Sequence, residues 1–93
     1  MLLPLLIACA PTPDTTCARA RDAIAACDDA FSLSDACAAN LGVCGDEDLA
    51  RWYGYYDCYA RACAEGTAYG EDAACSAELE GVSWGCNPAG GGI

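Results

Sequence analysis

The sequence predicts a small all-α protein: a single disulfide-stapled bundle of three to four short helices. Alanine is abundant and β-branched residues are few, which favours helices over strands. Apolar residues recur at intervals of three and four, as on one face of a helix. Nine cysteines occur in only 93 residues. A chain this short buries little apolar surface, and small secreted domains compensate with disulfides.

The first helix is expected to start after Thr16, which is a suitable N-cap. A second, shorter helix is expected from Asp35 to Leu41, because Gly42 then ends it. The first helix should bury one stripe at helical spacing, formed by Cys17, Ala20, Ile24, Cys27 and Phe31.

The third helix has the clearest signals. Asp46 is expected as its N-cap, and the acidic residues that follow suit the positive end of the helix dipole. Gly66 should end the helix, and Gly54 in its interior would allow a neighbouring segment to pack closely. The buried stripe of this helix should consist of Leu49, Trp52, Tyr56, Tyr59 and Cys63.

A fourth helix is expected over residues 71–80, with Cys75 on its buried side and Gly81 at its end. The disulfide-rich helical domain is therefore expected to cover residues 17–86. The last segment, residues 87–93, reads NPAGGGI and is expected to be a flexible tail.

Helix geometry restricts how the cysteines of this domain can pair. Cys58 and Cys63 lie five residues apart in one helix, so their Cα atoms exceed the usual disulfide limit of about 7 Å. Cys17 and Cys27 are about 15 Å apart along the first helix. Neither pair should form, while the other connectivities stay open. The expected disulfide cysteines are Cys17, Cys27, Cys37, Cys44, Cys58, Cys63, Cys75 and Cys86.

Composition argues against several functions. Four basic and 14 acidic residues give a net charge of −10, which disfavours nucleic acid and anionic membrane surfaces as partners. The chain has no His, so the usual general base is missing, and CxxC pairs are absent. We therefore expect no enzyme, catalytic residue, metal or cofactor. Residues 46–48 are acidic and are interpreted as a solvated helical turn rather than a calcium site. The acidity should keep the protein monomeric.

Residues 1–8, MLLPLLIA, are apolar throughout but too short to span a bilayer, and they fit the end of a signal peptide. No Lys or Arg precedes this run, so the signal is interpreted as either truncated or unusual. The motif Leu6-Ile7-Ala8-Cys9 resembles the lipobox of bacterial lipoproteins.

This resemblance implies cleavage before Cys9 and acyl chains on Cys9, so the membrane is the expected partner. Residues 9–16 would then be an extended tether, because they contain two prolines and small polar residues. Ala10 follows the lipid-bearing position, which in this family favours the outer membrane or cell surface. The odd cysteine count also fits, since removing Cys9 leaves an even number. The alternative is a chance motif, with Cys9 a disulfide partner or a free thiol.

The predicted function is a non-catalytic, lipid-anchored protein of a bacterial envelope, serving as a binding or structural module. The alternative is a secreted effector or inhibitor that docks on a protein partner through the aromatic third helix. Its aromatic residues cannot all face inward on one helix, although they could instead cover neighbouring helices and disulfides. This candidate binding surface consists of Trp52, Tyr53, Tyr55, Tyr56 and Tyr59.

Overall fold

The structure is a computed structural model that describes residues 10–27, 33–66 and 75–89. Within these ranges it is helical and contains no strand, so the predicted all-α, disulfide-stapled fold is confirmed. The elements are α2 (Pro13–Ala26), α3 (Cys37–Leu41), α4 (Asp46–Ala64) and a short 3-10 helix, η1 (Ala77–Leu79).

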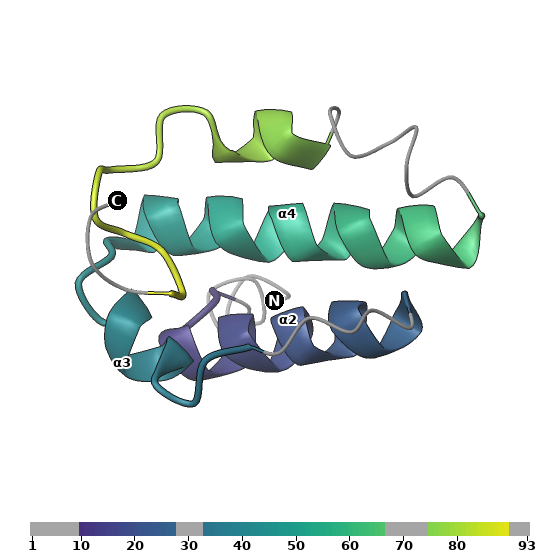
Figure 1. The fold of residues 1–93 in the computed structure, drawn as a ribbon. Helices are drawn as coiled ribbons and strands as arrows, with labels where there is room; N and C mark the ends of the chain where they lie inside the picture. Colours follow the sequence, from purple (N-terminus) through teal and green to yellow (C-terminus); the bar gives the residue numbers. More distant parts are fainter. Residues whose placement is uncertain (1–9, 28–32, 67–74, 90–93) are drawn as a thin grey trace, which may run out of the picture.

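The long helix α4 lies in the middle of the molecule, with α2 along one side and η1 along the other (Figure 1). Helices α2 and α4 run in the same direction, whereas the chain through η1 returns in the opposite direction. The first turns of α2 and α4 therefore lie at the same end of the molecule, together with α3 and the last described residues.

Helix α2 begins at Pro13, four residues earlier than expected, and Thr12 is its N-cap. The Thr15 amide donates to Thr12 Oγ1 (3.1 Å), and the Thr12 amide donates to Thr15 Oγ1 (2.9 Å). Pro13 occupies the first helical position, where its missing N–H is not needed. The prediction of an extended tether is thus wrong from Pro13 onward. Thr16 is a buried helical residue and not the N-cap.

The boundaries of the other two helices differ slightly from those expected. Helix α3 starts at Cys37, two residues later than predicted. Helix α4 starts at Asp46 itself with Gly45 as N-cap, so Asp46 adds charge to the first turn rather than capping it. The stop at Gly66 is confirmed, because this residue follows the helix with a φ of 76°.

Two of the expected helical segments reach beyond the described residues. Helix α2 ends at Ala26, and Phe31 of the predicted stripe lies outside the described part of the chain. Residues 71–74 of the predicted fourth helix also lie outside the described part of the chain. The end of that prediction is wrong, since η1 stops at Leu79 and Glu80 is extended.

The core consists of two clusters of buried side chains between α2, α3 and α4. We call the first the sulfur–leucine cluster; it contains Cys17, Cys37, Leu41 and Leu49. We call the second the aromatic–alanine cluster; it contains Ala20, Ala23, Tyr56 and Ala60. The half-buried Trp52 and Leu33 pack against both clusters, so the two form one continuous core.

The segment after the last cysteine is partly anchored. The Asn40 side chain donates from Nδ2 to the Pro88 carbonyl (2.7 Å), and Trp52 donates from Nε1 to the Cys86 carbonyl (2.9 Å). Pro88 itself is buried. The prediction of a flexible tail is therefore wrong for residues 87–88, because donors on α3 and α4 fix their position. Residues 90–93 lie outside the described part.

Candidate functional site

All eight cysteines of the domain are joined in four disulfides. The two excluded pairs are confirmed as absent, because each of their members bonds to a different segment. The pairs are Cys17–Cys37, Cys27–Cys63, Cys44–Cys86 and Cys58–Cys75.

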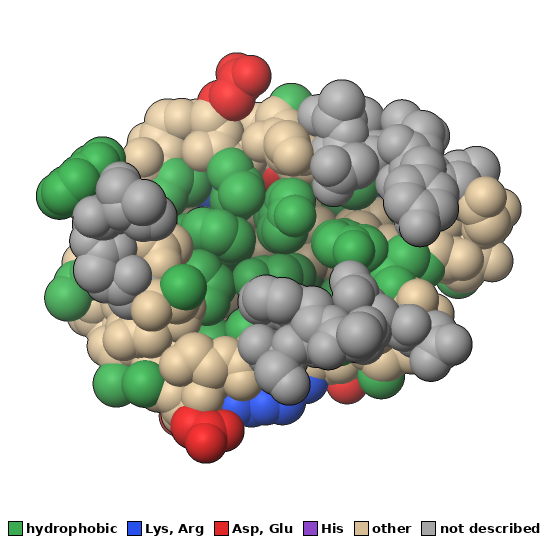
Figure 2. Space-filling model, viewed as in Figure 1, with side chains coloured by type: hydrophobic (Ala, Val, Ile, Leu, Met, Phe, Trp, Pro, Cys, Tyr) green, Lys and Arg blue, Asp and Glu red, His purple; other side chains and the backbone are tan. Residues whose placement is uncertain are grey.

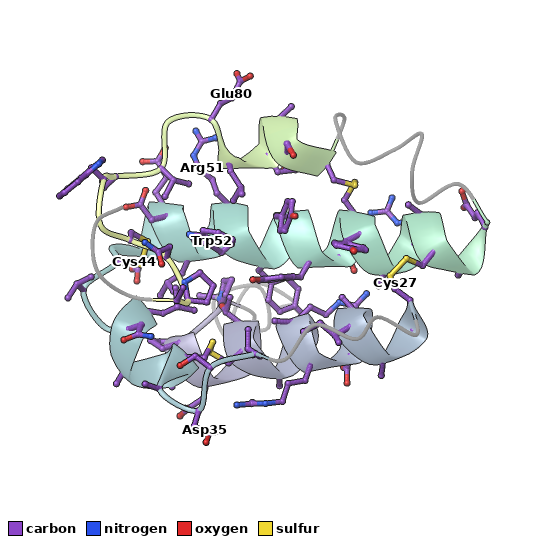
Figure 3. All side chains as sticks on the ribbon, in the orientation of Figure 1. Cys27, Asp35, Cys44, Arg51, Trp52 and Glu80 are labelled. Carbon is purple, nitrogen blue, oxygen red and sulfur yellow. A yellow bond between two sulfur atoms is a disulfide. The ribbon has the colours of Figure 1, made fainter. Side chains whose placement is uncertain are left out.

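These bridges form a frame around the helix pair. Cys27–Cys63 joins the C-terminal ends of α2 and α4, and its yellow sulfur bond is visible beside the label Cys27 in Figure 3. The Cys17–Cys37 bridge joins α2 to α3 and lies inside the sulfur–leucine cluster, with the two residues 1% and 0% exposed. The frame therefore fixes the shape of a domain whose core is small.

Four of the five candidate aromatic residues share one face of α4, since their spacing is three, four and seven residues. Trp52 stacks on Tyr56 at 5.7 Å between ring centroids. Tyr55 meets Tyr56 edge to face at 5.1 Å and Tyr59 at 6.1 Å. Tyr53 follows Trp52 directly and therefore projects from another side of the helix. The four rings form one contiguous assembly rather than separate side chains.

This aromatic face packs mainly against α2. Small residues there, Ala20 and Ala23, are fully buried and allow the rings of α4 to approach the backbone. Tyr56 is buried, and Trp52, Tyr55 and Tyr59 are half-buried. Figure 2 shows hydrophobic side chains gathered along α4 and along its seam with α2. The structure thus favours the interpretation that the rings cover the neighbouring helix, with partial access from outside.

Burial also changes the chemistry of the phenol at the centre of this face. Loss of hydration raises the pKa of Tyr56 well above its ordinary value, and neighbouring Tyr55 raises it further. The phenol is therefore neutral throughout the physiological range and acts as a structural group.

An ionic network crosses from α2 to α4. Arg19 Nη2 lies 2.8 Å from Asp57 Oδ1, and Arg61 Nη2 lies 2.9 Å from Asp57 Oδ2. The hydrogen bond from Arg19 lowers the pKa of Asp57, and Arg61 adds to the effect. A carboxylate held in its charged form by two cations is a weak proton acceptor, so this network supports the helix pair rather than acid–base chemistry.

Within the described ranges, two large hydrophobic side chains are exposed, Val43 (76%) and Trp84 (82%), and they flank one disulfide. Val43 directly precedes Cys44, and Trp84 lies two residues before Cys86, the partner of Cys44. The sequence patterns indicate no role for either residue. The sequence Ser83-Trp84-Gly85 indicates a turn, but no pattern in the sequence shows that Trp84 is exposed there.

The loop that carries Trp84 is held in place. The Cys86 amide donates to the Ser83 carbonyl (3.0 Å), and the Ser83 amide donates to Asp48 Oδ2 in the first turn of α4 (3.4 Å). Gly85 has a φ of 91°, which a side chain would disfavour. The exposed tryptophan is therefore presented by an ordered turn beside an acidic helix start.

Acidic residues at the start of α4 do not assemble into a metal site with their neighbours. Glu47 pairs with Arg51 along the helix at 3.6 Å. Within the described ranges, no group of three His, Cys, Asp or Glu residues is arranged to hold a metal ion. In the same part of the chain, none of the helices combines the length and apolar character needed to cross a bilayer. Cys9, the predicted lipid site, lies outside the described residues.

The fold and the bridges define a small helical domain whose core is completed by four disulfides. Comparisons of the chain with protein-family models, curated proteins and solved structures found no match.

Proposed function

We propose that this chain is a non-catalytic, lipid-anchored protein of a bacterial envelope, attached through acyl chains on Cys9 and acting as a monomeric binding or structural module. The outer membrane or the cell surface is the proposed location. The lipobox resemblance of residues 6–9 supports lipid attachment at Cys9. The disulfide-bonded helices form the domain that the lipid would hold at the membrane.

The observation that carries the proposal is the pairing of the cysteines. The other eight bond to one another, so none of them is left to bond with Cys9 within the chain. This argues against Cys9 as an intrachain disulfide partner. Acylation, a disulfide to another chain and a free thiol remain, and of these only acylation agrees with the residues before Cys9.

The disulfides also support the proposed compartment. Four bridges in so short a chain are typical of proteins outside the reducing cytoplasm. A lipoprotein of the bacterial envelope is exported into such an oxidising space before it folds. The anchor and the frame therefore point to the same destination.

Mass spectrometry of the intact protein, extracted from bacterial membranes, tests the proposal. The expected mass is that of a chain starting at Cys9, with added acyl chains and with eight hydrogens removed by the four disulfides. Cys9→Ser is the matched control, since it keeps the folded domain but should shift the protein to the soluble fraction. A membrane-extracted chain with an unmodified Cys9 would overturn the proposal.

The alternative function, docking on a protein partner through the aromatic helix, has weaker support. The rings of this face contact one another and pack on α2, so only part of their surface is accessible. A pull-down from envelope extracts with Tyr55→Ala and Tyr59→Ala controls tests it. A specific partner lost in both variants would favour this function over a structural module.

A further inference from the structure

The two exposed hydrophobic side chains lie at the end of the molecule where α2 begins. The Cys17–Cys37 bridge ties the second turn of α2 to α3, and Val43 follows α3 by two residues. The loop with Trp84 is bound to the same region through its bridge to Cys44 (Figures 1 and 3). This arrangement places Val43 and Trp84 at the same end of the molecule as the start of α2, which the proposed lipid anchor precedes in the chain.

The connection between anchor and domain is short. Because α2 begins at Pro13, only residues 10–12 separate it from Cys9. An extended chain spans at most about 3.5 Å per residue, so the start of α2 stays within about 14 Å of the lipid-bearing residue. The end of the molecule that carries Val43 and Trp84 is thus held within reach of the membrane surface.

We propose that Trp84, assisted by Val43, inserts into the headgroup region of the membrane that holds the anchor, and so orients the domain. This inference rests on the proposed function, because the acyl chains on Cys9 bring this end to the lipid. Tryptophan is suited to that position, since its ring is apolar and its indole N–H can still bond to water or headgroups. The ordered loop presents the side chain without a further ordering cost.

Charge selects the kind of lipid. The first turn of α4 carries Asp46, Glu47 and Asp48, and the Asp48 carboxylate touches the loop of Trp84. The whole chain carries a net charge of −10. Anionic headgroups would repel this end of the domain, whereas zwitterionic headgroups would not. The proposed contact is therefore with a zwitterionic phosphatidylcholine or phosphatidylethanolamine surface.

Fluorescence quenching tests the inference with the acylated full chain reconstituted in phosphatidylcholine vesicles that contain a doxyl-labelled lipid. Quenching and a blue shift of tryptophan emission are expected for the natural protein. In Trp84→Ser only Trp52 emits; it is half-buried and hydrogen-bonded to Cys86, and it should stay unquenched. Because Trp84 is exposed, this variant should fold, which its four disulfides and circular dichroism would verify.

A matched control moves the tryptophan to the other end of the molecule. Ala64 is the exposed last residue of α4, so Ala64→Trp in the Trp84→Ser chain gives an equally exposed ring far from the anchor. This ring should stay unquenched. Equal quenching at both ends, or none at Trp84, would overturn the inference. Stronger quenching in vesicles with phosphatidylglycerol would overturn the lipid preference.

The intact mass of the same sample separates this inference from the proposed function. If Cys9 carries acyl chains and Trp84 is unquenched, the anchor stands and the insertion of Trp84 is wrong. If Cys9 is unmodified, the proposed function is wrong and the inference falls with it. Acyl chains on Cys9 together with selective quenching of Trp84 would support both.

Discussion

The two core clusters hold α2 against different helices and by different means. In the sulfur–leucine cluster, α2 and α3 are joined by a buried disulfide between leucine side chains. In the aromatic–alanine cluster, no bridge is present, and the rings of α4 fill the space left by the small residues of α2. A covalent bond thus stabilises the contact between α2 and α3, and packing of large rings stabilises the contact between α2 and α4.

A small domain can thus be stabilised by a disulfide in one part of its core and by aromatic packing in another. A buried aromatic side chain contributes about 1.5–3 kcal/mol, and a disulfide about 2–4 kcal/mol. Because these contributions are similar, neither cluster alone is expected to determine the fold. Substitutions in the two regions should therefore change the free energy of unfolding in different ways.

Removing the buried bridge should have the largest effect. Cys17→Ala with Cys37→Ala is expected to lower the free energy of unfolding by about 2–5 kcal/mol, measured by urea denaturation. The control is Cys27→Ala with Cys63→Ala, whose residues are half-buried. Loop-closure entropy alone predicts that removing the Cys27–Cys63 bridge lowers the free energy of unfolding by about 0.5 kcal/mol more than removing the Cys17–Cys37 bridge. The reason is that the first bridge has a sequence separation of 36 residues and the second one of 20.

We expect the opposite order, because the first pair of alanines leaves a cavity inside the sulfur–leucine cluster. A greater loss for the control would show that the bridges act through the unfolded chain and that burial of the sulfurs adds little.

Enlarging an alanine beneath the aromatic rings should cause the next largest loss in the free energy of unfolding. Ala20→Leu inserts atoms where α2 meets the aromatic face and is expected to lower the free energy of unfolding by about 1–3 kcal/mol. Ala18→Leu is the control on the exposed side of α2, with an expected change within about 0.5 kcal/mol. Equal, small changes in the two variants would mean that the middle of the core is loosely packed.

High pH should weaken the aromatic–alanine cluster through Tyr56. Its pKa is raised in the folded state, so the unfolded chain ionises first and the free energy of unfolding falls as pH rises above about 10. Tyr56→Phe should reduce this loss, as measured by urea denaturation at about pH 9 and about pH 11. An unchanged alkaline loss in Tyr56→Phe would assign the effect to other groups.

Low pH should produce a smaller effect through Asp57. Its pKa is lowered in the folded state, so its contribution is present above the ordinary carboxyl pKa of about 4 and is lost as pH falls through the folded value. Arg19→Gln should reduce this acid dependence and cost less than about 1 kcal/mol at neutral pH. Arg61→Gln should change less, because that arginine is 62% exposed against 25% for Arg19. A larger change in Arg61→Gln than in Arg19→Gln would mean that the ion pair within α4 contributes more than the pair between α2 and α4.

Patterns within one segment predicted much of this molecule. The recurrence of apolar residues located α2 and α4, the stop at Gly42 located α3, and helical rise alone excluded a bridge between Cys58 and Cys63. The same rise did not reveal which segments meet, so the partners of these two cysteines had to come from the tertiary structure. The shared face of Trp52 and Tyr56 was visible in their spacing, but the alanines of α2 beneath it were not.

Two sequence-based predictions are wrong in part, the extended tether and the flexible tail, because other residues or distant contacts outweigh the signal on which each rests. The two prolines predict an extended tether, yet Pro13 at the first helical position favours the helix, and the mutual bonds of Thr12 and Thr15 cap it. The glycines near the C-terminus predicted a loose tail, but the hydrogen bond from Asn40 to Pro88 depends on contacts over 48 residues. No short sequence window contains that information.

The order of the bridges along the chain has a consequence for proteolysis. The intervals 17–37, 27–63 and 44–86 overlap in succession, so every peptide bond between Cys17 and Cys86 lies inside at least one closed loop. A protease that cleaves one such bond leaves two pieces that stay covalently attached. A protein nicked in this way would keep its mass on a non-reducing gel and would separate into fragments only after reduction.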